Sequence, residues 1–187
     1  MDIYDFYFHL QDNPTSKPCL TMHTCKFIEK VSENNSDLDF VGTNFTTEIV
    51  DNLNVKESNF SACYFSNMLF KDTIFQNCGG KDNTYRYSTF FKTKFLNCRL
   101  REDTFESCIL IDCTFENCFL FEMSFHNTVI ESMHIKESEV SSFGLFHSLL
   151  NNLEVENTSI ERPCHYMPLA TLDADTQKQL RPLGLTL

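Results

Sequence analysis

The sequence is poor in glycine, in basic residues and in long apolar runs. Only 5 of its 187 residues are Gly, and the phosphate-binding patterns G-x-x-x-x-G-K and G-x-G-x-x-G are both absent. The metalloprotease pattern H-E-x-x-H and the hydrolase pattern G-x-S-x-G are missing as well, so the usual enzyme signatures offer no catalytic residues. We therefore expect a protein that is not an enzyme and that holds no cofactor and no metal ion.

The chain also lacks a segment that could enter a membrane or direct secretion. No run is long and apolar enough to span a bilayer. The first residues carry Asp2 and Asp5 but no Lys or Arg before the apolar cluster, whereas a secretory signal begins with basic residues. The presence of 9 Cys without such a signal favours free thiols in a reducing compartment. These features predict no membrane insertion and a cytoplasmic location.

Positive charge is scarce, because 15 basic residues stand against 26 acidic ones and the net charge is -11. Contact with nucleic-acid phosphates or anionic lipid is unfavourable for such a chain, so we expect no direct nucleic-acid binding. One basic segment, residues 81–101, interrupts the acidic field. The repeat described next should scatter its side chains over several faces.

What the chain has in abundance is a large apolar residue at every fifth position. From Phe40 to Ile160 these positions are large and apolar in 24 of 25 cases, whereas the composition alone would give roughly 10. The residue two places before each apolar centre is mostly small or slender, and is often Cys. A period of five fits neither a helix nor a strand, so the chain must turn a corner once per pentad. These two positions should point inward and the other three outward.

This pattern resembles the pentapeptide-repeat family, whose repeat places a small residue two before a central Leu or Phe. The resemblance implies an all-β solenoid, a right-handed quadrilateral β-helix with four pentads per coil. Residues four pentads apart should then stack, and about six to seven coils should follow one another at a spacing of about 4.8 Å. The sequence departs from the commonest form by using Cys, Ser, Thr or Met where Ala is usual.

The two ends of the chain break the pattern and should cover the ends of the solenoid. Residues 1–37 should form an N-terminal cap and an irregular first coil, in which Met22 and Phe27 are apolar centres in a different frame. Residues 38–162 should form the β-helix itself. Residues 163–187 should form a C-terminal capping segment with one short helix.

Two positions inside the repeat are also exceptional. Gly80 falls where a large apolar centre is expected, which predicts that one corner loops out between Cys78 and Tyr85. Asp103 falls at an inward position, four pentads after Asn83. A buried carboxylate needs hydrogen-bond partners or a proton, so we expect a local polar ladder at this point.

Two sets of outward residues are candidate interaction sites, and the first is an apolar stripe beside the centres of one face. Large contiguous apolar patches usually mark an interface. A protein partner, a second copy of the chain or residues 1–19 could cover this stripe. It consists of Ile49, Leu69, Phe91, Ile109, Ile111, Val129 and Leu149.

The second set is an acidic edge that lies on two adjoining faces. Between Glu102 and Glu161 there are 12 acidic residues, and Lys136 is the one basic residue. The resulting charge density is comparable to that of duplex DNA, which carries one charge per ~1.7 Å. The edge consists of Glu102, Glu116, Glu122, Glu137, Glu139, Glu154 and Glu156.

We interpret the chain as a non-enzymatic module that binds another protein through the apolar stripe or the acidic edge, and a homodimer is a further option. The family resemblance implies two alternatives and a bacterial source. Some pentapeptide-repeat proteins mimic DNA and bind bacterial DNA gyrase or a related topoisomerase. Others form the β-helix domain of host-directed bacterial effectors, for which the partner would be a host protein and the location the host cytosol.

Overall fold

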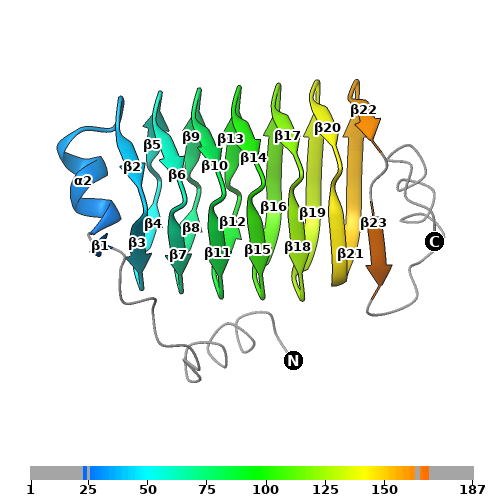
Figure 1. The fold of residues 1–187 in the computed structure, drawn as a ribbon, viewed down its shortest axis with the longest axis horizontal. Helices are drawn as coiled ribbons and strands as arrows, with labels where there is room; N and C mark the ends of the chain where they lie inside the picture. The colour runs from blue at the N-terminus through cyan, green and yellow to red at the C-terminus, as the bar shows by residue number, and fades with distance from the viewer. Residues whose placement is uncertain (1–22, 25, 163–164, 169–187) are drawn as a thin grey trace.

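The chain folds as a β-solenoid in which short strands stack along one long axis (Figure 1). The computed structural model describes residues 23–24, 26–162 and 165–168. Successive coils lie side by side in chain order, and one short helix lies at the N-terminal end of the stack. The predicted all-β solenoid is therefore confirmed.

Four pentads make one coil, as the strand register shows. The strands from β1 to β21 pair in parallel with the strand one coil away, and the paired residues are 20 apart, as in Phe45 with Phe65 and Phe105 with Phe125. The register shifts by one residue within β22 and β23. On one face, five such pairings link six successive strands. The solenoid therefore has four sides, and a five-residue period in the sequence fixes this register.

The strands fall on four faces, which we number in chain order from the first long coil. The first face holds β1 (His23–Thr24), β3 (Thr43–Thr46), β7 (Tyr64–Ser66), β11 (Thr84–Arg86), β15 (Thr104–Glu106), β18 (Ser124–His126), the start of β21 (Gly144–Glu156) and β23 (His165–Pro168). The second face holds β4 (Ile49–Asp51), β8 (Leu69–Lys71), β12 (Thr89–Phe91), the starts of β16 (Ile109–Glu116) and β19 (Val129–Lys136), and the middle of β21. The third face holds β5 (Asn54–Lys56), β9 (Ile74–Gln76), β13 (Lys94–Leu96) and the ends of β16, β19 and β21. The fourth face holds β2 (Asp39–Val41), β6 (Asn59–Ser61), β10 (Gly79–Lys81), β14 (Arg99–Arg101), β17 (Phe119–Phe121), β20 (Glu139–Ser141) and β22 (Ser159–Arg162).

The corner between two faces is a residue in the left-handed region of the backbone. From Asp37 to Asn157 every fifth residue has a positive φ, with values between 47° and 60°, and these corners comprise 24 non-glycine residues and Gly42. Asn and Asp tolerate this conformation best among the non-glycine residues, and they supply 12 of the corners. A single strained residue per pentad thus turns the chain without any need for glycine.

The core consists of aromatic stacks that run along the axis. Phe45, Phe65 and Tyr85 stack with ring centroids 4.9 and 4.8 Å apart, which matches the spacing of hydrogen-bonded strands. The column continues through Phe105 and Phe125 at 4.6 and 4.8 Å. Offset stacking of this kind adds to the burial of apolar area, so each ring stabilises both neighbouring coils.

A helix covers the N-terminal end of this core. Helix α2 (Phe27–Glu33) buries Phe27 fully, in edge contact with Phe45. The buried carboxylate of Glu48 accepts hydrogen bonds from the backbone N–H groups of Phe27 and Ile28 at 2.8 and 3.0 Å, which satisfies donors that a helix start leaves free. The predicted pentad centred on Phe27 was therefore wrong, because the helix places this side chain over the end of the core.

The predicted loop at Gly80 was also wrong. Strand β10 pairs in register with β6 and β14, so no residue is looped out of the coil. The side chain of Asn83 occupies the space that a large centre would fill, because a Cβ on Gly80 would lie 2.7 Å from the Asn83 amide nitrogen. A buried polar side chain in the next pentad thus compensates for the missing apolar one.

The C-terminal end of the described chain carries one irregularity. Ile160 pairs with Val140, but Arg162 rather than the preceding residue pairs with Ser141, so β22 contains a bulge. The predicted short C-terminal helix lies outside the described residues, as do residues 1–19. Among the helices that the structure describes, none has the length and apolarity to cross a bilayer.

Candidate functional site

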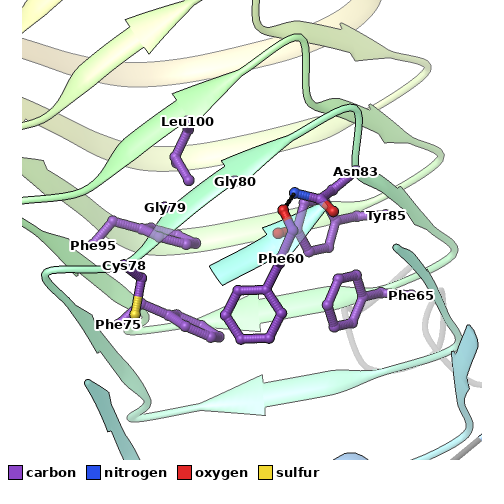
Figure 2. Close-up of a pocket in the computed structure, with 10 residues that line it drawn as sticks. All are labelled: Phe60, Phe65, Phe75, Cys78, Gly79, Gly80, Asn83, Tyr85, Phe95 and Leu100. Carbon is purple, nitrogen blue, oxygen red and sulfur yellow. Dashed lines mark hydrogen bonds between the residues drawn. The ribbon is translucent and has the colours of Figure 1, made fainter. Parts of the chain in front are cut away.

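The interior cavity beside Gly80 is too small to hold a ligand. It has a volume of about 10 Å³, which on this measure is the space of about one water molecule. Phe60, Tyr85 and Asn83 line it together with other core residues (Figure 2). The amide of Asn83 donates a hydrogen bond to the Phe60 carbonyl at 2.8 Å (Figure 2), so this amide is already partnered.

Asp103 forms the polar ladder that the sequence predicts. It is 0% exposed, and its Oδ1 accepts hydrogen bonds from the backbone and the side-chain amide of Asn83 at 2.9 and 3.1 Å. Burial raises the pKa of Asp103 to about 7, although the bonds from Asn83 act in the opposite direction. Its Oδ2 has no hydrogen-bond partner among the described residues.

The hydrogen bonds of the other inward polar side chains explain why the protonated form of Asp103 fits this position. Inward Ser, Thr and Cys side chains donate to the carbonyl 23 residues earlier, as Thr93 does to Phe70 at 3.2 Å and Cys118 to Phe95 at 3.2 Å. The equivalent acceptor for Asp103 is the carbonyl of Gly80. A carboxylate cannot donate to it, whereas a carboxylic acid can.

Two of the buried cysteines, Cys108 and Cys113, are hydrogen-bond donors to backbone carbonyls rather than reactive groups. Six free thiols are described and all are buried. Burial raises the pKa of Cys108 and of Cys113 to about 12, so these thiols stay protonated at neutral pH and are poor nucleophiles. No group of metal-ligating side chains occurs among the described residues.

The apolar stripe is only partly available to a partner. Its two ends are exposed, with Ile49 at 61% and Leu149 at 38%. Leu69, Phe91, Ile111 and Val129 are half-buried.

Ile109 corrects the predicted stripe, because it is 1% exposed and offers no surface to a partner. It lies in register between Thr89 and Val129 of the neighbouring coils, and Thr89 is itself buried. Outward side chains in a parallel ladder shield each other's flanks, so alternation along one strand does not by itself give the exposure of a residue.

The acidic edge divides into paired and unpaired carboxylates. Two of its members form ion pairs, Glu102 with Lys81 at 3.5 Å and Glu122 with Arg162 at 3.6 Å, and Glu154 shares a hydrogen bond of 2.7 Å with His134. Glu116, Glu137, Glu139 and Glu156 are exposed, and no ion pair within the described chain involves them. The free negative charge is therefore concentrated at the corner between the third and fourth faces.

A polar groove lies at this same corner. It has a volume of about 300 Å³, and its lining includes Arg99, Phe119, Glu137 and Glu139. The corner side chains Asn117, Asn97 and Asn77 form a ladder of hydrogen bonds of 2.8 and 3.1 Å along its floor.

The fourth face carries a group of residues that the sequence analysis missed. Arg101 and Arg162 both lie over the ring of Phe121, each 5.6 Å from its centroid, and Phe119 lies 6.1 Å from the same ring. The basic segment is partly scattered, as expected, yet Lys81, Arg99 and Arg101 share this face. The sequence does contain a signal for this group. The triplets Arg99–Arg101 and Phe119–Phe121 are 20 residues apart, and their first and last residues flank an apolar centre.

Comparisons with known proteins give similarities to solved structures alone. No protein-family model and no curated protein sequence matches the chain. The structure of QnrB1, a plasmid-mediated fluoroquinolone resistance protein, matches with a TM-score of 0.44 at 14% identity, over 81% of this chain and 90% of that one. The pentapeptide-repeat protein Rfr23 from the cyanobacterium Cyanothece 51142 matches with a TM-score of 0.32 at 8% identity, over 72% of this chain and 97% of that one.

A further match is HetL, a pentapeptide-repeat protein involved in heterocyst differentiation regulation, from the cyanobacterium Nostoc sp. strain PCC 7120. Its TM-score is 0.21 at 8% identity, over 75% of this chain and 78% of that one. The chain's own geometry decides the fold, since each pentad turns one corner and four pentads close one coil. The chain is a four-sided β-solenoid built from five-residue repeats.

Proposed function

We propose that this β-solenoid is a non-enzymatic module that binds a basic surface of another protein. The observation that carries the proposal is the cluster of four exposed, unpaired carboxylates beside the polar groove. We call this cluster the acidic corner, and it consists of Glu116, Glu137, Glu139 and Glu156. Complementary charge speeds and orients protein association, and a rigid stack of coils presents the charges without an ordering cost.

The test compares matched variants in a partner search. The triple variant Glu116→Lys, Glu137→Lys and Glu156→Lys removes the free charge at exposed positions, so it should keep the fold. A protein that binds the acidic corner should be captured by the parent and lost with the triple variant, and its affinity for the parent should fall as salt is raised. A variant with Glu57→Lys, which reverses an exposed glutamate outside both proposed surfaces, is the control. If every captured protein binds the parent and the triple variant equally, the proposal is wrong.

A second candidate function is mimicry of DNA toward bacterial gyrase, which the acidic corner favours by its charge spacing. Four unpaired carboxylates within three coils, roughly 10 Å of axis, give about one charge per 2.5 Å, close to the ~1.7 Å of duplex DNA. The parent should then inhibit gyrase supercoiling at micromolar concentration, and the triple variant should not. Supercoiling that is unaffected by the parent would exclude inhibition of this kind.

The apolar stripe is the other surface that we propose for protein contact. Its exposed ends, Ile49 and Leu149, and its half-buried middle, Phe91 and Ile111, are the residues available for it. A double variant with Ile49→Ser and Leu149→Ser should weaken binding at this surface and leave the acidic corner unchanged. Equal binding by the parent and this double variant would remove the stripe as a contact surface.

A further inference from the structure

The fourth face carries three neighbouring strands whose outward residues form two short rows. Strands β14, β17 and β20 pair in register, so Arg99, Phe119 and Glu139 make one row. Arg101 and Phe121 make the other, which ends at the buried Ser141. Aromatic side chains therefore lie at the middle strand, and opposite charges flank Phe119 in the first row.

The aromatic pair at the middle strand has the character of an interface centre. The rings of Phe119 and Phe121 lie nearly parallel, with an interplanar angle of 10°, and both side chains are half-buried. Arg101 and Arg162 hold Phe121 from its two sides through cation–π contacts. Aromatic residues and Arg are the residue types enriched at protein interfaces.

The flanking charges are free to pair with another molecule. Arg99 and Glu139 are both exposed, and neither is part of an ion pair within the described chain. They lie one coil before and one coil after Phe119, so roughly 10 Å of sheet separates them. That distance is too long for a direct ion pair between them in one chain.

The row of Arg99, Phe119 and Glu139 is complementary to itself. Two copies can be related by a two-fold axis that is parallel to β17 and lies in the plane of contact. This rotation places the coil before β17 in one copy against the coil after β17 in the other. Arg99 of one copy then meets Glu139 of the other, twice, and Phe119 meets its own copy. In the other row the same axis brings Lys81 of one copy near Arg162 of the other, but each of these cations already pairs with an acidic residue of its own copy. An axis along the solenoid would instead place Arg99 against Arg101 of the other copy, which like charges oppose.

We propose that two copies of this chain pair through the fourth face, with their solenoid axes antiparallel and β17 on the two-fold axis. The contact is narrow, because a three-residue strand is only about 10 Å long. It falls below the roughly 800 Å² per partner of a standard interface, so the dimer is weak and its stability decreases with salt. The contact shares Glu139 with the acidic corner, so the two proposals are tested with different variants.

Sedimentation velocity over a range of concentrations tests the pairing in the full-length protein. The parent should show a concentration-dependent dimer at low salt. The single variants Arg99→Glu and Glu139→Arg place like charges together twice, and each should weaken dimerisation by at least roughly tenfold. The charge-swapped double variant, Arg99→Glu with Glu139→Arg, should restore the dimer.

The control variant is Glu156→Arg, which reverses an exposed glutamate on the third face and should leave the dimer unchanged. Circular dichroism checks that every variant is folded. A parent that stays monomeric at high micromolar concentration overturns the proposal, and so does a dimer that survives Arg99→Glu or that the double swap fails to restore. The variant used for partner binding alters neither Arg99 nor Glu139, so failure of one proposal leaves the other to stand by its own measurement.

Discussion

At the scale of single residues, the inward position two before each centre does more than fill space. Its hydroxyl, thiol or amide donates to a carbonyl 23 residues earlier, and so ties one coil to the one before it. Cys and Thr serve equally well, because both combine small volume with a donor. Asp103 and Glu48 are the acidic members of the set. Glu48 accepts hydrogen bonds from the start of helix α2 instead, whereas the oxygen of Asp103 can replace those donors only when it is protonated.

We therefore predict that Asp103 makes stability depend on pH. Its pKa is raised from 3.8 to about 7 in the folded protein, so its contribution is fully present below the unfolded pKa and is lost as the pH rises through 7. Asp103→Asn stays neutral and should be the more stable protein at pH 8, by up to about 4 kcal/mol. Thermal melts of both proteins from pH 4 to pH 9 measure this difference. A parent and variant with parallel pH profiles would contradict the prediction.

A second residue-scale prediction concerns Gly80. An added Cβ would lie 2.7 Å from the Asn83 amide nitrogen and 3.1 Å from the Phe60 carbonyl oxygen, and these two atoms share a hydrogen bond. Gly80→Ala should therefore cost about 1–3 kcal/mol in the free energy of unfolding. Gly79→Ala is the matched control, because its nearest contact would be an ordinary 3.6 Å. Equal urea midpoints for the two variants would show that the space at Gly80 is not restricted.

At the scale of elements, helix α2 and the solenoid complete each other. The helix has no side-chain cap of its own at Lys26, and the buried carboxylate of Glu48 supplies one from the second face. In return Phe27 covers the rings at the open end of the core. A solenoid needs such a cover, because its terminal coil would otherwise expose apolar side chains to water.

We predict that Glu48→Ala loosens this cover. The backbone N–H groups of Phe27 and Ile28 would lose their acceptor, at a cost of about 1–3 kcal/mol. Hydrogen exchange of these two amides should speed up, and the melting temperature should fall by roughly 2–4 °C per kcal/mol. Glu57→Ala removes an exposed corner glutamate and serves as the control. Unchanged exchange at Phe27 and Ile28 in Glu48→Ala would show that another group caps the helix.

At the scale of the whole molecule, stability is distributed along the axis. Each coil contacts mainly the coil before it and the coil after it, and the interface between two coils repeats with the same register. Such a chain behaves as a one-dimensional array whose units contribute separately. A complete coil should then be dispensable, whereas a shift of the five-residue frame should not be tolerated.

Two internal deletions test this. Removal of residues 86–105 takes out one coil of 20 residues and keeps every column in register, so the shortened protein should fold, with a modestly lower melting temperature. Removal of residues 86–103 changes the frame and would bring polar outward residues into the core. This second protein should be unfolded by circular dichroism. Two deletions with the same stability would mean that the frame does not determine the fold.

The part of the structure that can be predicted from the sequence is the part whose contacts repeat with the five-residue period. The five-residue period predicts the corners, the inward positions and the stacking of Phe105 on Phe125, because every pentad meets the same surroundings. It also predicts that Asp103 lies in a polar ladder with Asn83. The same reasoning failed at Gly80 and at Phe27, where one residue is compensated by a particular neighbour rather than by the pattern.

The sequence by itself determined the solenoid, its register and the direction of nearly every side chain, since these depend on a local repeat. Only the tertiary structure decided which outward residues meet. Arg162 reaches the ring of Phe121 because a one-residue bulge places it level with Ser141, and Ile109 is buried although its place in the pentad points outward. Contacts of this kind depend on residues in other coils and on single irregularities such as the bulge. Neither can be predicted from the five-residue period.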